Sequence, residues 1–119
     1  MSTPKIFESE YKFCLILWEN EPIKSPALAE ICKEKLGWSK TTTYTVIKRL
    51  RDRGVVKSED TVVTSLISKD AAQMAEIDEL MLKKFDGSIS AFVAAFSKYQ
   101  RLTANKISEI RRIIDEGEK

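Results

Sequence analysis

The 119-residue sequence predicts a mostly α-helical protein with one small β-hairpin. Apolar residues recur at helical spacing in six segments, and one pair of β-branched runs flanks a polar turn. The hairpin directly follows two helices joined by a tight link, which is the order of a winged helix-turn-helix. Hydrophobic residues make up 43% and charged residues 32% of the chain, enough for both a core and a solvated surface.

The first predicted helix runs from about Glu8 to Asn20 and ends at Glu21-Pro22, because proline does not continue a helix. Its apolar stripe consists of Tyr11, Cys14, Leu15, Leu17 and Trp18. A short extended piece, Ile23-Lys24, separates this helix from the next one.

The second and third helices form the predicted helix-turn-helix. Ser25 is an N-cap for a helix over Pro26–Leu36, with Pro26 at the first helical position. The link Gly37-Trp38-Ser39 supplies a left-handed stop and a second N-cap. The third helix then runs over Lys40–Arg53 and stops at Gly54.

The hairpin is predicted from two short runs, Val55–Lys57 and Val62–Leu66, with Ser58–Thr61 as a four-residue turn. The turn carries Glu59 and Asp60, whose negative charges would repel an anionic partner at the predicted tip.

Three further helices are predicted in the C-terminal part, over Lys69–Phe85, Ile89–Phe96 and Ala104–Glu116. The last one carries isoleucines along one face with charged residues around them. We therefore divide the chain into a winged-helix domain, residues 1–67, and a helical region, residues 68–119.

Positive charge is concentrated around the third helix. Residues 33–57 hold eight basic and two acidic residues, a balance of +6, whereas residues 69–119 hold nine of each sign. Such a local excess is typical of a phosphate-binding surface. A solvated helix face is the alternative, and charge alone does not decide between them.

The third helix has two distinct faces. At 100° per residue one face gathers Thr43, Val46, Ile47 and Leu50, which we expect to be buried. The opposite face is polar and consists of Thr41, Thr45, Lys48 and Asp52, flanked by Tyr44 and Arg49. Threonine hydroxyls and methyls, lysine and arginine suit base edges and phosphates in a DNA groove. The alternative is that these threonines only cap the helix and cover its surface, without a role in binding.

The candidate DNA-binding residues follow from this placement. Those on or next to the helix are Ser39, Lys40, Thr41, Thr42, Tyr44, Thr45, Lys48 and Arg49. Three more, at the helix end and on the first wing strand, are candidates for sugar-phosphate contacts: Arg51, Arg53 and Lys57.

The residue inventory excludes several other functions. The chain has no histidine, no glycine-rich phosphate loop and no base partner evident for Cys14 or Cys32, so we expect no enzyme, metal or cofactor. We interpret both thiols as small buried hydrophobes, with a redox role as the alternative. No apolar run is long enough to cross a membrane and residues 1–7 lack a secretory signal, so we expect a cytoplasmic protein with no membrane partner.

These residues resemble the penicillinase-repressor family, the BlaI/MecI/CopY group of bacterial regulators. The resemblance is carried by Trp38–Thr42 and by the pattern Val46-Ile47-x-Arg49-Leu50-x-x-x-Gly54. It extends upstream to Glu10-Tyr11 and Leu17-Trp18, and downstream to Gly87-Ser88, Leu102-Thr103 and the isoleucine-rich last helix. It implies a repressor that binds a palindromic operator as a homodimer, with the third helix as recognition helix.

The resemblance also implies that the C-terminal helices form the dimerisation region. The candidate dimerisation residues are Met74, Ile77, Met81, Phe92, Phe96, Ile107, Ile110, Ile113 and Ile114. In β-lactam-responsive members a sensor protease triggers cleavage at an Asn-Phe bond, and the corresponding pair here is Ala95-Phe96, without the asparagine. Copper-responsive members carry a C-terminal cysteine motif, whereas this chain has no cysteine after Cys32.

Two departures from the family pattern concern the DNA-binding half. The wing is short and lacks aromatic residues in Val62–Leu66, and Lys40 replaces a proline after the turn serine. The alternative function is a winged-helix module that binds a protein without specific DNA binding. Lysine is depleted at protein interfaces, so the basic third helix favours DNA.

Overall fold

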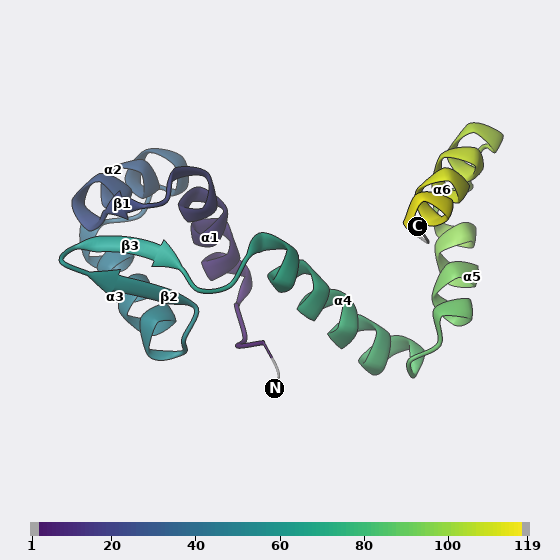
Figure 1. Cartoon of the computed structure of the whole chain (residues 1–119), viewed down its shortest axis with the longest axis horizontal. Helices are drawn as coiled ribbons and strands as arrows, with labels where there is room; N and C mark the ends of the chain where they lie inside the picture. Colours follow the sequence, from purple (N-terminus) through teal and green to yellow (C-terminus); the bar gives the residue numbers. More distant parts are fainter. Residues whose placement is uncertain (1–2, 118–119) are drawn as a thin grey trace. The chain divides into compact units, whose positions relative to one another are not determined.

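The computed structural model describes residues 3–117, which form helices and one small sheet (Figure 1). The elements in chain order are α1 (Glu8–Asn20), β1 (Ile23–Lys24), α2 (Ser25–Leu36), α3 (Lys40–Asp52), β2 (Val56–Glu59), β3 (Val62–Ser65), α4 (Lys69–Phe85), α5 (Ile89–Gln100) and α6 (Ala104–Gly117). The chain divides into two compact units, Met1–Ile77 and Asp78–Lys119. The predicted mostly helical fold with a winged helix-turn-helix is confirmed.

The predicted bounds of α1 and α4 match the structure, and those of α2, α3 and α6 differ by one residue. The helix α2 begins at Ser25, so the N-cap position belongs to Lys24 instead of Ser25. The predicted end of α5 at Phe96 was wrong, because the helix continues to Gln100. No glycine or proline interrupts residues 97–100, and the helix stops at Arg101, whose φ is 46°.

The hairpin turn is tighter than predicted. Ser58 and Glu59 belong to β2, and Glu59 pairs with Val62 across a two-residue turn, Asp60-Thr61. The φ angles of Asp60 and Thr61 are 51° and 66°. Two positive φ angles are the mark of the type I′ turn, whose twist matches that of paired strands. The sequence lacks the usual Asn-Gly or Asp-Gly signal, which is why the turn was predicted too long.

Replacing Thr61 with glycine is expected to stabilise the protein by about 1 kcal/mol. A β-branched residue is strained at positive φ, and glycine after Asp60 gives the pair that this turn prefers. Urea unfolding followed by circular dichroism measures the change. The control is Thr64→Gly in β3, which should destabilise; a loss of stability in Thr61→Gly as well would contradict the turn assignment.

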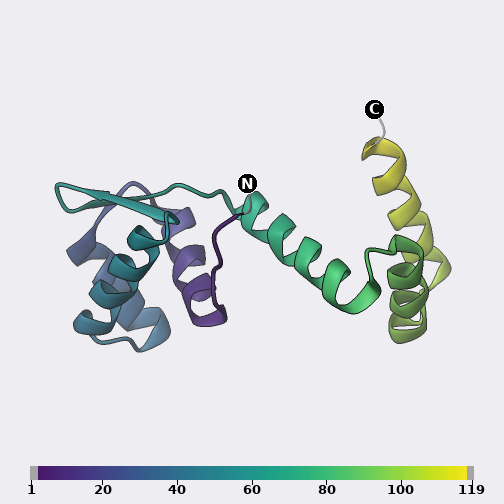
Figure 2. The same cartoon turned by 90° about the horizontal axis from the view of Figure 1, so that it is seen from below.

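The extended piece before α2 is a third strand. The sheet has the order β1-β3-β2, and Ile23 lies opposite Val63 in antiparallel pairing. The N–H of Ser25 also donates to the carbonyl oxygen of Thr61 at 2.8 Å. Figure 2 shows the resulting hairpin along one side of α1, α2 and α3. The sheet thus ties the wing to the start of α2.

One hydrophobic core joins α1, α2, α3, the sheet and the start of α4. Its buried members are Ile6, Phe13, Cys14, Ile16, Leu17, Leu28, Cys32, Val46, Ile47, Leu50, Val55, Val56, Val63 and Ala72. The predicted stripe on α1 was partly wrong: Tyr11, Leu15 and Trp18 are only half-buried, while Phe13 and Ile16 are buried. Residues 13–18 are all apolar, so periodicity does not select a face there.

The first unit extends beyond the predicted domain boundary at residue 67. Ala72 in the second turn of α4 is buried in the core. The indole N–H of Trp18 donates to the carbonyl oxygen of Ile67 at 3.0 Å, and Gln73 contacts the hydroxyl of Tyr11 at 3.5 Å. These contacts place the first turns of α4 with the winged helix.

The second unit has a small aromatic cluster. The rings of Phe85 and Phe92 meet edge to face at 5.4 Å, and those of Phe92 and Phe96 stack at 6.0 Å. Among the described residues from 78 to 117, no side chain with an assigned burial is fully buried. The unit therefore leaves much of its apolar surface uncovered in a single chain.

Most of the predicted dimerisation residues, in both units, are exposed in the single chain. Exposed members are Met74, Ile77, Phe96, Ile107, Ile113 and Ile114. Half-buried members are Met81, Phe92 and Ile110.

Candidate nucleic-acid interface

The helix α3 is fixed at its N-terminal end by the tight link that precedes it. Gly37 adopts a φ of 71° and its N–H donates to the carbonyl oxygen of Lys33 at 3.0 Å, which ends α2. The hydroxyl oxygen of Ser39 then accepts from the N–H of Thr42 at 3.1 Å and lies 2.9 Å from the Thr42 hydroxyl. The predicted N-cap at Ser39 is confirmed, and the link turns α3 sharply away from α2.

The predicted inner face of α3 is confirmed. Thr43, Val46, Ile47 and Leu50 are all buried, and the three apolar ones belong to the core. Their packing leaves a single face of the helix open to the solvent. The direction in which the functional side chains point is thus set by the core.

The open face of α3 carries the central candidates. Thr41, Thr45, Lys48 and Arg49 are all exposed. Within residues 3–117, neither Lys48 nor Arg49 forms an ion pair with a carboxylate. Two long cations in the last turns of α3 and two hydroxyls nearer its start are therefore available to an anionic ligand.

The remaining candidates on or next to α3 have partners of their own. The ammonium of Lys40 lies 5.8 Å from the ring centre of Tyr44, and that ring is half-buried against the core. The guanidinium of Arg51 lies 3.7 Å from the carboxylate of Asp52, with both side chains at least half exposed. Ion pairs this exposed are weak and exchange readily for phosphate.

The wing holds one candidate, Lys57 on β2. Its ammonium lies 3.4 Å from the carboxylate of Glu59 on the same face of the hairpin. The acidic Glu59 therefore offsets part of the charge of Lys57, consistent with leaving the tip out of the interface.

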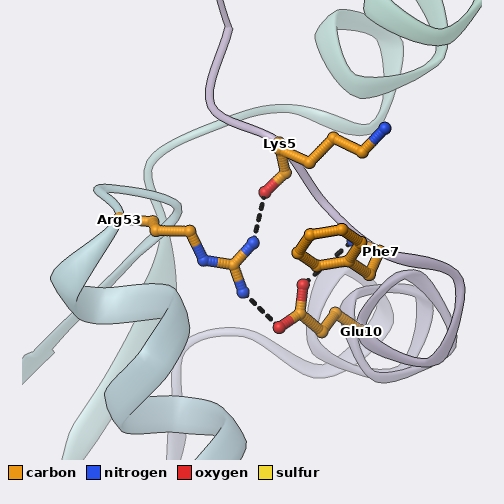
Figure 3. A network of polar contacts seen from close by, with 4 residues as sticks. All are labelled: Lys5, Phe7, Glu10 and Arg53. Carbon is orange, nitrogen blue, oxygen red and sulfur yellow. Dashed lines mark hydrogen bonds and ion pairs between the residues drawn. The ribbon is translucent and has the colours of Figure 1, made fainter.

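Arg53 is placed differently from the prediction. It was expected to be a phosphate contact, but its guanidinium donates to the carbonyl oxygen of Lys5 at 2.7 Å and pairs with the carboxylate of Glu10 (Figure 3). It also lies 5.2 Å from the ring centre of Phe7. The reason is its position as C-cap residue of α3, where the side chain turns back toward α1.

Glu10 is the residue of this network that sequence reasoning did not single out for a role. It is 6% exposed, which is unusual for a carboxylate unless it is paired. One signal was present: an acidic residue three positions after the N-cap of α1, as in a capping box. Its pairing with Arg53, 43 residues away, depends on the tertiary fold.

The thiols of Cys14 and Cys32 are both buried, which disfavours their ionisation. Burial, reinforced by the negative charge of Glu10, raises the pKa of Cys14 to about 12. Burial also raises the pKa of Cys32, with the Thr43 hydroxyl acting in the opposite direction. Both side chains are therefore protonated at neutral pH, and a thiol in this state is a weak nucleophile and metal ligand.

Residues 3–117 of the structure contain neither a candidate metal site nor a candidate membrane span. No three histidine, cysteine or acidic side chains there are grouped so that they could hold a metal ion. In the same residues, no helix has the length and apolar character needed to cross a membrane.

The chain is similar to known proteins over most of its length. The sequence model of the penicillinase repressor family matches residues 6–116. The methicillin resistance regulatory protein MecI of Staphylococcus aureus is 23% identical over 117 residues, covering 95% of each chain. A crystal structure of a MarR-family protein from Mycobacterium tuberculosis covers 90% of this chain and 71% of its own, at 22% identity and a TM-score of 0.38.

The family match spans both units, from the N-terminal segment before α1 to the last turn of α6. It includes the link before α3, the exposed face of that helix and the apolar helices α4 to α6. A match of this extent makes the protein a regulator of transcription rather than an enzyme. The chain belongs to the penicillinase repressor family.

Proposed function

We propose that the protein is a transcriptional repressor that binds a palindromic DNA operator as a homodimer, with α3 in the major groove. The observation that carries the proposal is the exposed face of α3. Lys48 and Arg49 lie there with no carboxylate partner in the described part of the chain, beside Thr41 and Thr45. The major groove admits one helix, and these side chains match its donors, acceptors and thymine methyls.

Each part of the face has a distinct role in this proposal. Lys48 and Arg49 reach guanine edges or the flanking phosphates, and Thr41 and Thr45 contact thymine methyls or hydrogen-bond base edges. Ser39, Lys40, Thr42 and Tyr44 lie at the start of the helix, where they contact the groove edge. Arg51 and Lys57 contact phosphates and position the protein without reading sequence. Arg53 is left out because its guanidinium already pairs with Glu10.

Dimerisation would give the protein a two-fold symmetry that matches the proposed palindromic operator. The apolar side chains exposed on α4, α5 and α6 include Ile113 and Ile114, each more than half exposed in the single chain. A second copy would cover them, and a two-fold dimer matches a palindrome. Binding to chromosomal DNA would place the protein in the cytoplasm.

A sensor protease as a partner stays a prediction. The Ala95-Phe96 bond lies in the interior of α5, where the backbone is helical on both sides. Proteases prefer exposed loops and chain ends, so cleavage here would require α5 to unwind locally.

Selection from a random pool of DNA duplexes tests the proposed function. The wild-type chain is expected to enrich a palindromic sequence and to bind it with an affinity that falls steeply as the salt concentration rises. A scrambled duplex of equal length serves as the control. If no sequence is enriched and binding to both duplexes is weak at low salt, the protein is not a DNA-binding repressor, and the protein-interaction alternative replaces it.

A further inference from the structure

The residues that join the end of α3 to the N-terminal segment form a polar network of their own (Figure 3). Arg53 lies at its centre and uses two nitrogens. Nη1 donates to the carbonyl oxygen of Lys5 at 2.7 Å, and Nη2 donates to Oε2 of Glu10. The other oxygen of Glu10, Oε1, accepts from the backbone N–H of Phe7 at 2.9 Å. One carboxylate and one guanidinium thus connect α1, α3 and the segment before α1.

The network is largely shielded from water. The side chain of Glu10 is 7% exposed and that of Arg53 is 28% exposed. The ring of Phe7 lies against the guanidinium, with its centre 5.2 Å away. Removing one partner of this partly buried pair is costly chiefly for Glu10, which would keep its charge in a poorly solvated position. The contact therefore contributes more to the fold than a fully exposed surface pair does.

The position of Arg53 makes this contact relevant to the exposed face of α3. Arg53 is the C-cap residue of the same helix that carries Lys48 and Arg49. A helix of this length is about 20 Å long, so a tilt of about 3° at one end moves the other end by about 1 Å. Hydrogen bonds to base edges tolerate only a few tenths of an ångström. Anchoring the far end of α3 therefore fixes where its first turns meet the groove.

We propose that Arg53 and Glu10 are positioning residues for DNA recognition: their contact fixes the tilt of α3 against α1 without touching DNA. This proposal rests on the proposed function and assigns a role in sequence specificity to a pair that lies behind the interface. It differs from a phosphate contact in a measurable way. A positioning pair affects the discrimination between sequences, whereas a phosphate contact affects all sequences and their salt dependence.

The variant that tests the pair is Glu10→Gln. Glutamine has one oxygen that accepts and one nitrogen that only donates, so it cannot offer a separate oxygen to each of Phe7 and Arg53 as the carboxylate does. Affinity is measured over a series of salt concentrations for the duplex that the wild-type chain selects and for a scrambled duplex. Glu10→Gln is expected to weaken binding to the selected duplex about tenfold and to the scrambled duplex less than twofold, with an unchanged salt slope.

Two matched variants complete the comparison. Glu8→Gln removes the same charge at an exposed position two residues earlier in α1 and should leave both affinities unchanged. Arg51→Gln removes an exposed arginine from α3, should weaken binding to both duplexes, and should lower the salt slope by about one. The double variant Glu10→Gln/Arg53→Gln leaves no unpaired buried charge and should behave like Glu10→Gln, with the wild-type salt slope.

Hydrogen exchange separates this proposal from the proposed function, since it needs no DNA. In Glu10→Gln the amide of Phe7 should exchange faster than in the wild type, at a temperature where circular dichroism shows both chains folded. Unchanged exchange, unchanged discrimination, or a salt slope lowered by about one in the double variant would overturn the proposal. A wild-type chain that selects no duplex, with faster exchange in Glu10→Gln, would instead refute the DNA-binding function itself.

Discussion

Ile114→Asp is expected to convert the proposed dimer into a monomer and to abolish high-affinity binding to a palindromic duplex. Ile114 is 57% exposed in the single chain, so the change removes little packing within one copy. In a dimer the same position would bury an unpaired carboxylate, at a cost of about 3 kcal/mol or more. That cost raises the dimer dissociation constant more than a hundredfold. Analytical ultracentrifugation measures the oligomeric state directly.

The control for Ile114→Asp is Ser108→Asp. Ser108 lies on the same helix, on the polar face with Arg111 and Arg112, and is exposed. The new charge there should leave the dimer intact. If Ile114→Asp also stays dimeric, the isoleucine face of α6 is not the dimer interface. Ile110→Asp should act in the same direction, but Ile110 is half-buried and its loss also disturbs packing within one copy.

Removing Lys48 or Arg49 is expected to weaken binding to the selected duplex by about 1–3 kcal/mol, if each side chain reads a base edge. Both are exposed and without a carboxylate partner in the described residues, so alanine at either position should leave the fold intact. Fluorescence anisotropy with the selected and the scrambled duplex measures the effect. A base-reading side chain lowers mainly the affinity for the selected duplex, whereas a phosphate contact lowers both.

Lys69→Ala serves as the control for this pair, because Lys69 carries the same charge at an exposed position at the start of α4. It should change neither affinity by more than about twofold. If Lys48→Ala and Arg49→Ala both bind the selected duplex as the wild type does, the exposed face of α3 is not the recognition surface. The dimer prediction would be unaffected by that result, since it depends on α6.

The local signals of the sequence were reliable at the link between α2 and α3, although Ser25 is not the N-cap that its position before Pro26 predicted. Ser39 caps α3, Gly37 takes the left-handed conformation that ends α2, and the buried and exposed faces of α3 lie as its periodicity predicts. The helix α5 was predicted to end with its apolar pattern at Phe96, but residues 97–100 contain no glycine or proline and the helix continues through them. Contacts between distant residues had no such local signal.

The amino-acid sequence by itself determined the order of the elements, the family and the face of α3 that faces the solvent. Capping, periodicity and local charge are properties of neighbouring residues, so they can be followed along the chain. The tertiary structure decided the third strand β1, the tight Asp60-Thr61 turn and the role of Arg53. A strand pair or an ion pair between distant residues forms only when the fold brings them together. The sequence alone therefore indicates an exposed cation at Arg53, whereas in the folded chain Arg53 pairs with Glu10.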